Sequence, residues 1–170
     1  MTDLQQRLAK GQEPAFVELY DQFGETLFAY VASRVADQNA AKDIIQDVFA
    51  RLIRYHRHFK RVENLKAYLF QVARNEISRW AARKPVNTKE TDADDMSAES
   101  SAESELEQRD WIRATLAQLD EQDREILSLK IFSELTFKEL ATVMDMPAAT
   151  VATRYRRAIK KLEASIKEKT

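Results

Sequence analysis

The sequence contains no cysteine and only two glycines and three prolines in 170 residues. The absence of cysteine excludes disulfide frameworks, thiol catalysis and cysteine-ligated zinc. So few glycines disfavour β-hairpins, tight turns and phosphate-binding loops, which depend on glycine, so Rossmann, P-loop and all-β folds fit poorly. No apolar run approaches the roughly 20 residues that cross a bilayer, and the N-terminus has no apolar signal core. We therefore expect a cytoplasmic protein without membrane insertion.

Charge is nearly balanced over the whole chain but segregated along it. Lys and Arg number 27 against 28 Asp and Glu, which gives a formal net charge of −1. Residues 51–84 carry 10 basic and 2 acidic side chains, and residues 150–170 carry 7 basic and 2 acidic ones. Residues 85–110 carry 2 basic and 9 acidic side chains. Two basic blocks separated by an acidic block indicate a different protein from a uniformly neutral one.

The acidic block is also the segment of lowest complexity. Residues 85–105 are rich in Ser, Asp and Glu and hold few large apolar residues. Such a segment cannot bury enough surface to offset its ordering entropy, so we expect a flexible linker. It is either a solvated spacer or an acidic cover for a basic surface.

Elsewhere, apolar residues recur at helical spacing, and no segment alternates as a strand does. Phe16, Leu19, Tyr20 and Phe23 form one stripe, which resumes after Gly24, a residue that can interrupt the helix. Further helices are expected at 40–59, 64–83, 106–119, 123–132, 137–144 and 148–167, the first of them with apolar rows made by Ile44, Ile45, Val48, Phe49, Leu52 and Ile53. The predicted fold class is all-α, with an N-terminal helical bundle (1–84) and a C-terminal helix-turn-helix domain (106–170) joined by the linker.

The most specific local signal lies in the C-terminal domain. Thr136-Phe137-Lys138-Glu139 has the pattern of a capping box, and Asp145-Met146-Pro147 predicts a turn before a long basic helix. A short helix, a turn and a basic second helix are typical of helix-turn-helix domains, whose second helix enters the major groove. Val151, Tyr155, Ala158 and Leu162 should face inward, which leaves an outer face of Ala148, Ala149, Ala152, Thr153, Arg156, Arg157 and Lys160.

The expected helix at 64–83 combines basic and aromatic residues. Arg74, Arg79 and Arg83 alternate with a buried row, and Tyr68, Phe70 and Trp80 are interleaved with them. Cations with aromatic rings suit single-stranded nucleic acid, whose bases stack and whose phosphates attract positive charge. Taken alone, an amphipathic core helix with arginines reaching to solvent explains the pattern better.

Three motifs in order resemble the extracytoplasmic-function (ECF) class of bacterial sigma-70 family sigma factors. AKDIIQDVFARL at 41–52 resembles the AxDxxQDVFxRL pattern of region 2, and AYLFQVARN at 67–75 resembles the promoter-melting helix. Residues 116–163 resemble region 4. The chain departs from that family where Ala152 replaces a frequent Lys, where Asp145 replaces the helix-turn-helix Gly, and where Tyr68 replaces a frequent Trp.

The resemblance implies a non-enzymatic factor that binds core RNA polymerase through its clamp coiled coil and flap and recognises promoter DNA. The implied polymerase-binding residues are Asp43, Gln46, Asp47 and Ala50. The implied −10 contacts are Tyr68, Arg74, Asn75, Arg79 and Lys84, with the 58–64 loop near the base pocket, and the implied −35 contacts are Thr150, Thr153, Arg154, Arg156, Arg157 and Lys160. It also implies an anti-sigma partner and a monomeric free protein.

No other constellation points to catalysis, a metal or a cofactor. His56 and His58 are two residues apart, so on a helix they face different sides, and nothing completes a metal set. Carboxylates are plentiful, but none is paired with a base or nucleophile. Two alternatives to a sigma factor remain: a helix-turn-helix regulator with a helical sensor domain, and a helical adaptor that binds acidic partners.

Overall fold

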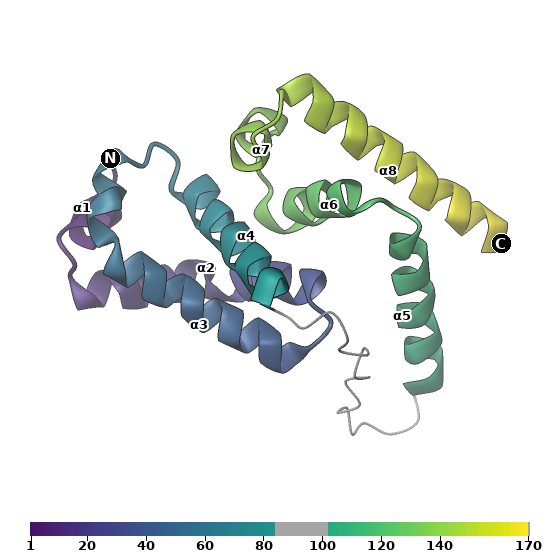
Figure 1. The fold of residues 1–170 in the computed structure, drawn as a ribbon, viewed down its shortest axis with the longest axis horizontal. Coiled ribbons are helices and arrows are strands. Elements are labelled where there is room, and N and C mark those ends of the chain that lie inside the picture. Colours follow the sequence, from purple (N-terminus) through teal and green to yellow (C-terminus); the bar gives the residue numbers. More distant parts are fainter. Residues whose placement is uncertain (84–101, 170) are drawn as a thin grey trace.

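The computed structural model describes residues 1–83 and 102–169, where every regular element is a helix (Figure 1). The N-terminal lobe consists of α1 (Asp3–Ala9), α2 (Glu13–Arg34), α3 (Gln38–Arg54), the 3-10 helix η1 (His56–Arg61) and α4 (Leu65–Arg83). The C-terminal lobe consists of α5 (Ala102–Ala117), α6 (Glu121–Ser133), α7 (Phe137–Met144) and α8 (Ala148–Lys169). The all-α prediction is confirmed. Lys84 and residues 85–101 of the expected linker lie outside the described residues, and α5 begins inside the range expected to be linker.

Two expected helix boundaries in the N-terminal lobe are wrong. α2 runs unbroken through Gly24, because one helix-interior glycine costs only about 1 kcal/mol relative to alanine, which tertiary packing overcomes. The helix expected at 40–59 ends at Arg54, where Tyr55 leaves helical geometry with φ −106° and ψ 32°. The chain continues as η1, whose Phe59 is fully buried against Phe16.

Helix α1 was not expected from apolar periodicity because it has only seven residues. Its start carries a second capping box, in which the Thr2 hydroxyl accepts the backbone N–H of Gln5 and the Gln5 side chain accepts that of Thr2. The Gln5 amide also donates to the backbone carbonyl of Val62 (2.9 Å), which ties α1 to the end of η1. The Thr-x-x-Gln spacing was therefore the available signal.

Helix α7 has the bounds and the caps that the sequence predicts. The Thr136 hydroxyl accepts the Glu139 N–H (3.2 Å), and the Glu139 carboxylate accepts the Thr136 N–H (2.7 Å). Asp145 then adopts the left-handed conformation (φ 53°, ψ 50°), as expected for the residue that replaces a glycine there. This turn directs α8 across α7.

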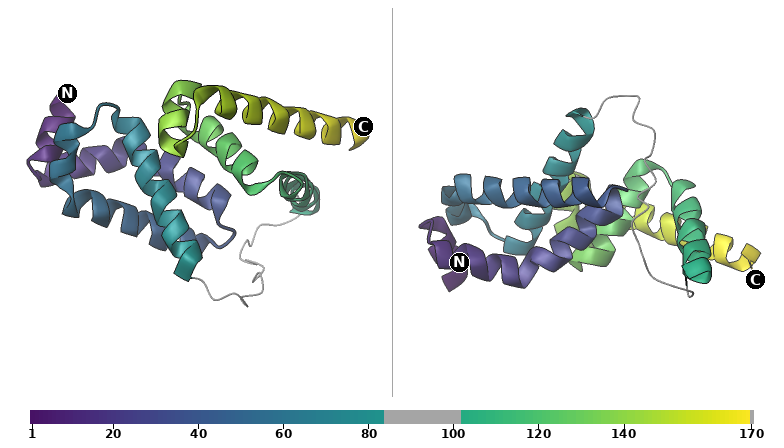
Figure 2. Two further views of the ribbon diagram at one scale, coloured as in Figure 1. Left: turned by 45° about the horizontal axis from the view of Figure 1, so that its top comes forward. Right: turned by 90° about the horizontal axis from the view of Figure 1, so that it is seen from below.

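One core of buried apolar residues spans both lobes, since α2 contacts α6 and α4 contacts α7 (Figure 2). Leu19, Leu52 and Leu69 are fully buried in the N-terminal lobe, as are Ile126 and Leu140 in the C-terminal one. Two residues of the predicted apolar stripes are exceptions. Tyr20 and Ile53 are 56% and 50% exposed.

The capping box of α7 generates a stability prediction. Thr136→Ala removes the hydroxyl that satisfies the Glu139 N–H and should lower the free energy of unfolding by about 1 kcal/mol in urea titrations followed by circular dichroism. Thr142→Ala, at an exposed position inside the same helix, is the control and should cause no loss. An equal loss in both variants would contradict a capping role for Thr136.

The Thr136 N–H holds the pKa of Glu139 below its ordinary value. The contribution of this carboxylate is therefore present above the ordinary pKa and is lost as the pH falls through the lowered one.

Candidate nucleic-acid interface

Helix α8 divides into a buried face and an exposed basic face. Val151 and Ala158 are fully buried, and the ring of Tyr155 packs against Phe137 with centroids 5.5 Å apart. Ala152, which the sequence placed on the outer face, is also buried, because α8 packs against both α6 and α7 and its inner face is broader than one stripe. The exposed residues of the predicted −35 set are Thr150, Thr153, Arg156, Arg157 and Lys160.

Arg154 and Arg157 bind an internal carboxylate. Asp123 is fully buried at the start of α6, and its oxygens lie 2.8 Å from Arg154 and 3.3 Å from Arg157. Arg154 also lies 3.4 Å from Asp120, the N-cap of α6. The pKa of Arg154 is raised above its ordinary value, chiefly by the hydrogen bond to Asp123. These two arginines fix α8 against α6, so Arg154 is held inside the lobe, while the Arg157 side chain remains 50% exposed.

The predicted −10 set on α4 is divided in a similar way. Asn75 and Arg79 are exposed, whereas Tyr68 is half-buried and lies edge-on to Phe59 (centroids 5.5 Å apart). Burial raises the pKa of the Tyr68 hydroxyl. Lys84 lies outside the described residues. The guanidinium of Arg74 points across to the C-terminal lobe.

The lobes are joined by polar contacts that involve this face. Arg74 Nε lies 2.5 Å from a carboxylate oxygen of Glu125 on α6, and both side chains are mostly buried. Asn64, just before α4, donates to the Glu139 carboxylate at the start of α7 (2.7 Å). The contact therefore occupies Arg74 and covers one side of α4.

The interface between the lobes leaves some polar atoms unsatisfied. The Tyr30 hydroxyl and Arg34 Nε are buried without a hydrogen-bond partner among the described residues. Both belong to α2, which packs against α6, and Arg34 approaches Glu121 of α6 only to 3.9 Å. Burial raises the pKa of Tyr30, so its hydroxyl stays protonated. Buried unpaired polar groups reduce the net stability of an interface.

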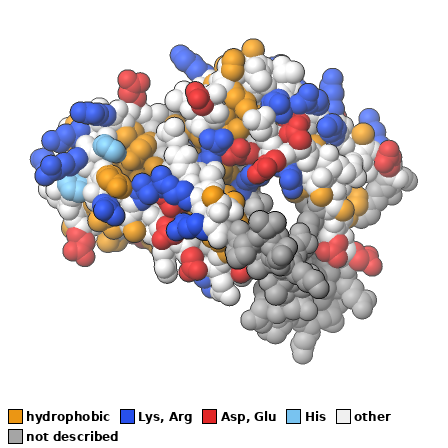
Figure 3. Space-filling model, in the orientation of Figure 1, with side chains coloured by type: hydrophobic (Ala, Val, Ile, Leu, Met, Phe, Trp, Pro, Cys, Tyr) orange, Lys and Arg blue, Asp and Glu red, His pale blue; other side chains and the backbone are white. Residues whose placement is uncertain are grey.

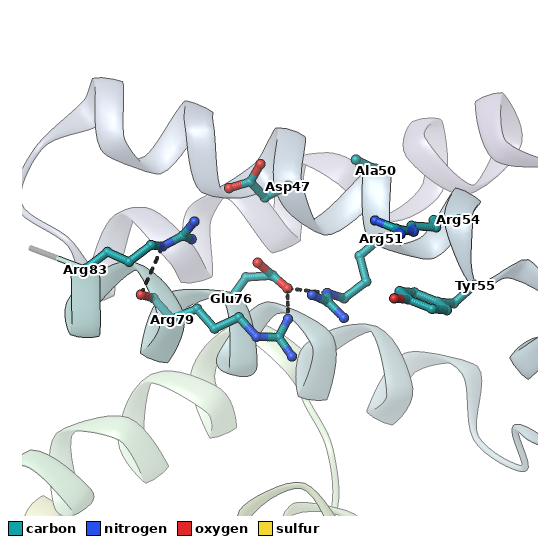
Figure 4. A pocket seen from close by; sticks show the side chains of 8 residues that line it. All are labelled: Asp47, Ala50, Arg51, Arg54, Tyr55, Glu76, Arg79 and Arg83. Carbon is teal, nitrogen blue, oxygen red and sulfur yellow. Dashed lines mark hydrogen bonds and ion pairs between the residues drawn. The ribbon is translucent and has the colours of Figure 1, made fainter.

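The polar face of α3 meets α4 at a groove of about 250 Å³ (Figure 4). Asp43, Gln46, Asp47 and Ala50 are all exposed, as the amphipathic pattern predicts. The groove is lined by Asp47, Ala50, Arg51, Arg54, Tyr55, Glu76, Arg79 and Arg83. The implied polymerase residues Asp47 and Ala50 and the implied −10 residue Arg79 therefore share one groove.

A buried carboxylate organises this groove. Glu76 is 4% exposed, and one of its oxygens accepts both Arg51 from α3 and Arg79 from the next turn of α4 (Figure 4). Sequence reasoning assigned no role to Glu76 or Arg51. The available signal was the Glu76–Arg79 spacing of three residues, which places opposite charges on one helix face.

Further cations gather at the end of the N-terminal lobe. Figure 3 shows Lys and Arg over the end formed by α1 and η1 and along α8. Arg57, Lys60 and Arg61 of η1 are exposed, and the His58 ring stacks on Tyr55 (14° between planes). His56 instead contacts the Ala9 carbonyl (Nδ1–O 3.0 Å), so the two histidines have separate roles.

The described ranges contain no group of three His, Asp or Glu side chains placed to hold a metal ion. Nor does any helix within them have the length and apolar character required to span a membrane.

Family comparisons match both lobes. Residues 19–85 match the model "Sigma-70 region 2", and residues 109–162 match "Sigma-70, region 4". The chain is 30% identical over 149 residues to RNA polymerase sigma factor SigZ of Bacillus subtilis, covering 86% of this chain and 84% of that protein. It is 27% identical over 153 residues to ECF RNA polymerase sigma factor SigM of the same bacterium, covering 86% and 92%.

Solved structures share the fold. CnrH, in complex with the cytosolic domain of CnrY, matches with a TM-score of 0.73 and 22% identity over 98% of this chain and 97% of that chain. Sigma factor RpoE, in complex with the anti-sigma factor NepR from Bartonella quintana, matches with a TM-score of 0.67 and 21% identity over 88% and 97%.

The Asp123 contacts separate structural from exposed arginines on α8. Arg154→Ala leaves the buried Asp123 with Arg157 as its remaining cation and should lower the free energy of unfolding by about 1–3 kcal/mol. Arg156→Ala, two residues away and exposed, should change it by less than about 0.5 kcal/mol. Thermal unfolding of both variants measures the difference, and equal melting temperatures would contradict the structural role of Arg154.

Proposed function

The chain belongs to the ECF group of the sigma-70 family and is an RNA polymerase sigma factor that directs transcription initiation, and from this premise we propose which surfaces perform each step. The polar face of α3 binds core RNA polymerase through its clamp coiled coil, and the flap binds the C-terminal lobe. Helix α4 recognises and opens the −10 element, and α8 holds the −35 duplex. The alternatives of a sensor-linked regulator and an adaptor do not account for the paired matches to regions 2 and 4.

One observation carries the polymerase assignment. Asp43, Gln46 and Asp47 are exposed together on one side of α3, while the opposite side of that helix is buried in the core. An exposed acidic and amide surface suits a basic partner, and complementary charge accelerates and orients docking. Ala50 leaves room at the centre of that surface for a partner side chain.

The two DNA surfaces have the chemistry of their targets. On α8, the methyl groups of Thr150 and Thr153 suit thymine methyls, and Arg156 and Lys160 suit phosphate or guanine. On α4, Asn75 and Arg79 are placed for strand contacts, with Tyr68 and the 58–64 loop beside them. Extruding a base costs a few kcal/mol, which a cationic surface with aromatic rings offsets.

Initiation requires the lobes to separate. Elements named −10 and −35 lie about 25 base pairs apart, which is about 85 Å of duplex at 3.4 Å per base pair. Because α4 contacts α7 and α7 contacts α8, the axes of α4 and α8 approach to about 20 Å in the arrangement described here. Opening also releases Arg74 from Glu125. The unsatisfied Tyr30 hydroxyl and Arg34 Nε favour such opening, since water pairs them once they are exposed.

The free protein is a monomer that acts in the cytoplasm, where promoter DNA is located, and an anti-sigma factor keeps it from polymerase. The shared fold with RpoE, whose structure contains an anti-sigma factor, supports a partner of this kind.

Transcription with core RNA polymerase tests the proposed surfaces. We expect core polymerase plus this protein to yield promoter-specific transcripts from a promoter library that core polymerase alone does not yield. Asp47→Arg should weaken binding to core polymerase at least tenfold because it places a cation on the acidic face. Arg156→Ala should retain polymerase binding and weaken use of −35-dependent promoters. Wild-type polymerase affinity in Asp47→Arg would remove α3 from the proposal.

The contact between Arg74 and Glu125 generates a conformational prediction. Glu125→Gln removes the charge that holds Arg74 and should shift the ratio of open to closed molecules about tenfold toward open, equivalent to about 1.4 kcal/mol. Single-molecule energy transfer between dyes on the two lobes measures that ratio. Glu121→Gln is the control, since Glu121 is 82% exposed and lies 3.9 Å from Arg34. Equal distributions in the wild type and Glu125→Gln would contradict the role of this ion pair.

A further inference from the structure

Apolar side chains remain exposed along the seam between α2 and α3. Val17 and Tyr20 on α2 are each 56% exposed, and Ile53 on α3 is 50% exposed. Three residues connect the two helices, which run antiparallel (Figure 2). Val17 therefore lies toward Ile53, and Tyr20 meets Phe49 edge-on with ring centroids 5.2 Å apart. Exposed apolar residues in a continuous row mark an interaction surface more often than isolated ones do.

A hollow of about 350 Å³ continues this row, lined by Tyr20, Asp21, Gly24, Glu25, Phe28 and Ile45. We call the row and the hollow together the α2–α3 groove. From Val17 to Phe28 it follows about three turns of α2, or about 17 Å at 1.5 Å per residue. That length fits one short helix of another protein.

Gly24 explains why the hollow is open. It lies in the interior of a 22-residue helix, where glycine costs about 1 kcal/mol relative to alanine. A Cβ placed at this position would meet the Tyr20 ring at 3.2 Å. Glycine thus lets the Tyr20 ring lie close against the backbone of α2 instead of being pushed away from it. The unfavourable residue maintains the shape of the groove.

Charge specifies the occupant. Asp21 and Glu25 are exposed in the lining of the hollow, and no basic side chain lines it. Two carboxylates repel DNA phosphate but attract lysine or arginine beside an apolar helix face. Residues two apart on a helix differ by about 200° in direction, so Ile45 faces away from Asp43 and Asp47. The groove and the proposed polymerase face therefore lie on different sides of α3.

We propose that the α2–α3 groove binds an amphipathic helix of a protein partner, one that carries apolar residues on one face and lysine or arginine beside them. The partner is a protein other than RNA polymerase, and it inserts an apolar side chain over Gly24 while its cations pair with Asp21 and Glu25. Tyr20 is an anchor of the site, since partly exposed aromatic residues beside a hollow commonly dominate binding energy.

A synthetic helix serves as the probe. The peptide has 14 residues, with leucine at positions i, i+4, i+7 and i+11 and lysine on both flanks, and its binding to the full chain is followed by fluorescence anisotropy. We expect saturable binding that a peptide with glutamate in place of lysine does not show. Equal binding of both peptides, or of a scrambled sequence, would overturn the charge argument.

Two variants locate the binding site. Gly24→Ala should weaken peptide binding about tenfold while leaving the melting temperature unchanged or higher, because alanine favours the helix but displaces Tyr20. The double variant Asp21→Lys and Glu25→Lys should weaken it by a similar factor through charge alone. Ile131→Glu is the control, since Ile131 is an exposed apolar residue on α6. Peptide affinity unchanged in both groove variants would overturn the proposal.

Two further measurements distinguish other occupants. Core polymerase should bind Gly24→Ala as tightly as it binds the wild type. A parallel loss of polymerase affinity would make the groove part of the polymerase surface and overturn the proposal. Sedimentation should show a monomer up to high concentration, and a dimer abolished by Gly24→Ala would identify a second copy of the chain as the occupant instead.

Discussion

A carboxylate removed from water must be paired, because an isolated buried charge costs several kcal/mol. Three carboxylates of this chain are buried: Glu76, Asp123 and Glu125. Their partners are all arginines, namely Arg51 and Arg79, Arg154 and Arg157, and Arg74. This requirement fixes α4 against α3, α8 against α6, and one lobe against the other. It also decides which cations are left for a ligand.

The three sites differ in what they hold together, and their functions differ accordingly. Asp123 lies within the C-terminal lobe, so its pairs stabilise the position of the recognition helix. Glu76 lies under an open groove, where Arg79 remains partly exposed and is still available to nucleic acid. Glu125 joins two lobes that must part for promoter recognition, so its pair with Arg74 opposes activity. The same chemistry therefore serves the fold at one site and restrains function at another.

Local signals in the sequence were sufficient where they were complete within a few residues. The capping box at Thr136 and the left-handed turn at Asp145 define α7 without any tertiary contact, and both were predicted. The end of α3 at Arg54 was not, because the buried Phe59 and the contact between His56 and Ala9 form only when α1 packs beneath η1. Likewise, Tyr20 fits an apolar stripe by spacing, but its exposure depends on what α3 leaves uncovered.

The sequence by itself determined the helical class, the two domains, the family, and the faces of α3, α4 and α8 on which the binding residues lie. These features follow from helical periodicity, capping residues and charge blocks, all of which are local in the chain. Tertiary structure alone decided that Arg74 and Arg154 have internal partners, since those carboxylates are 51 and 31 residues away. It also decided that Gly24 keeps a groove open. Periodicity gives the direction of a side chain from its helix axis, whereas its partner depends on the helix that packs against it.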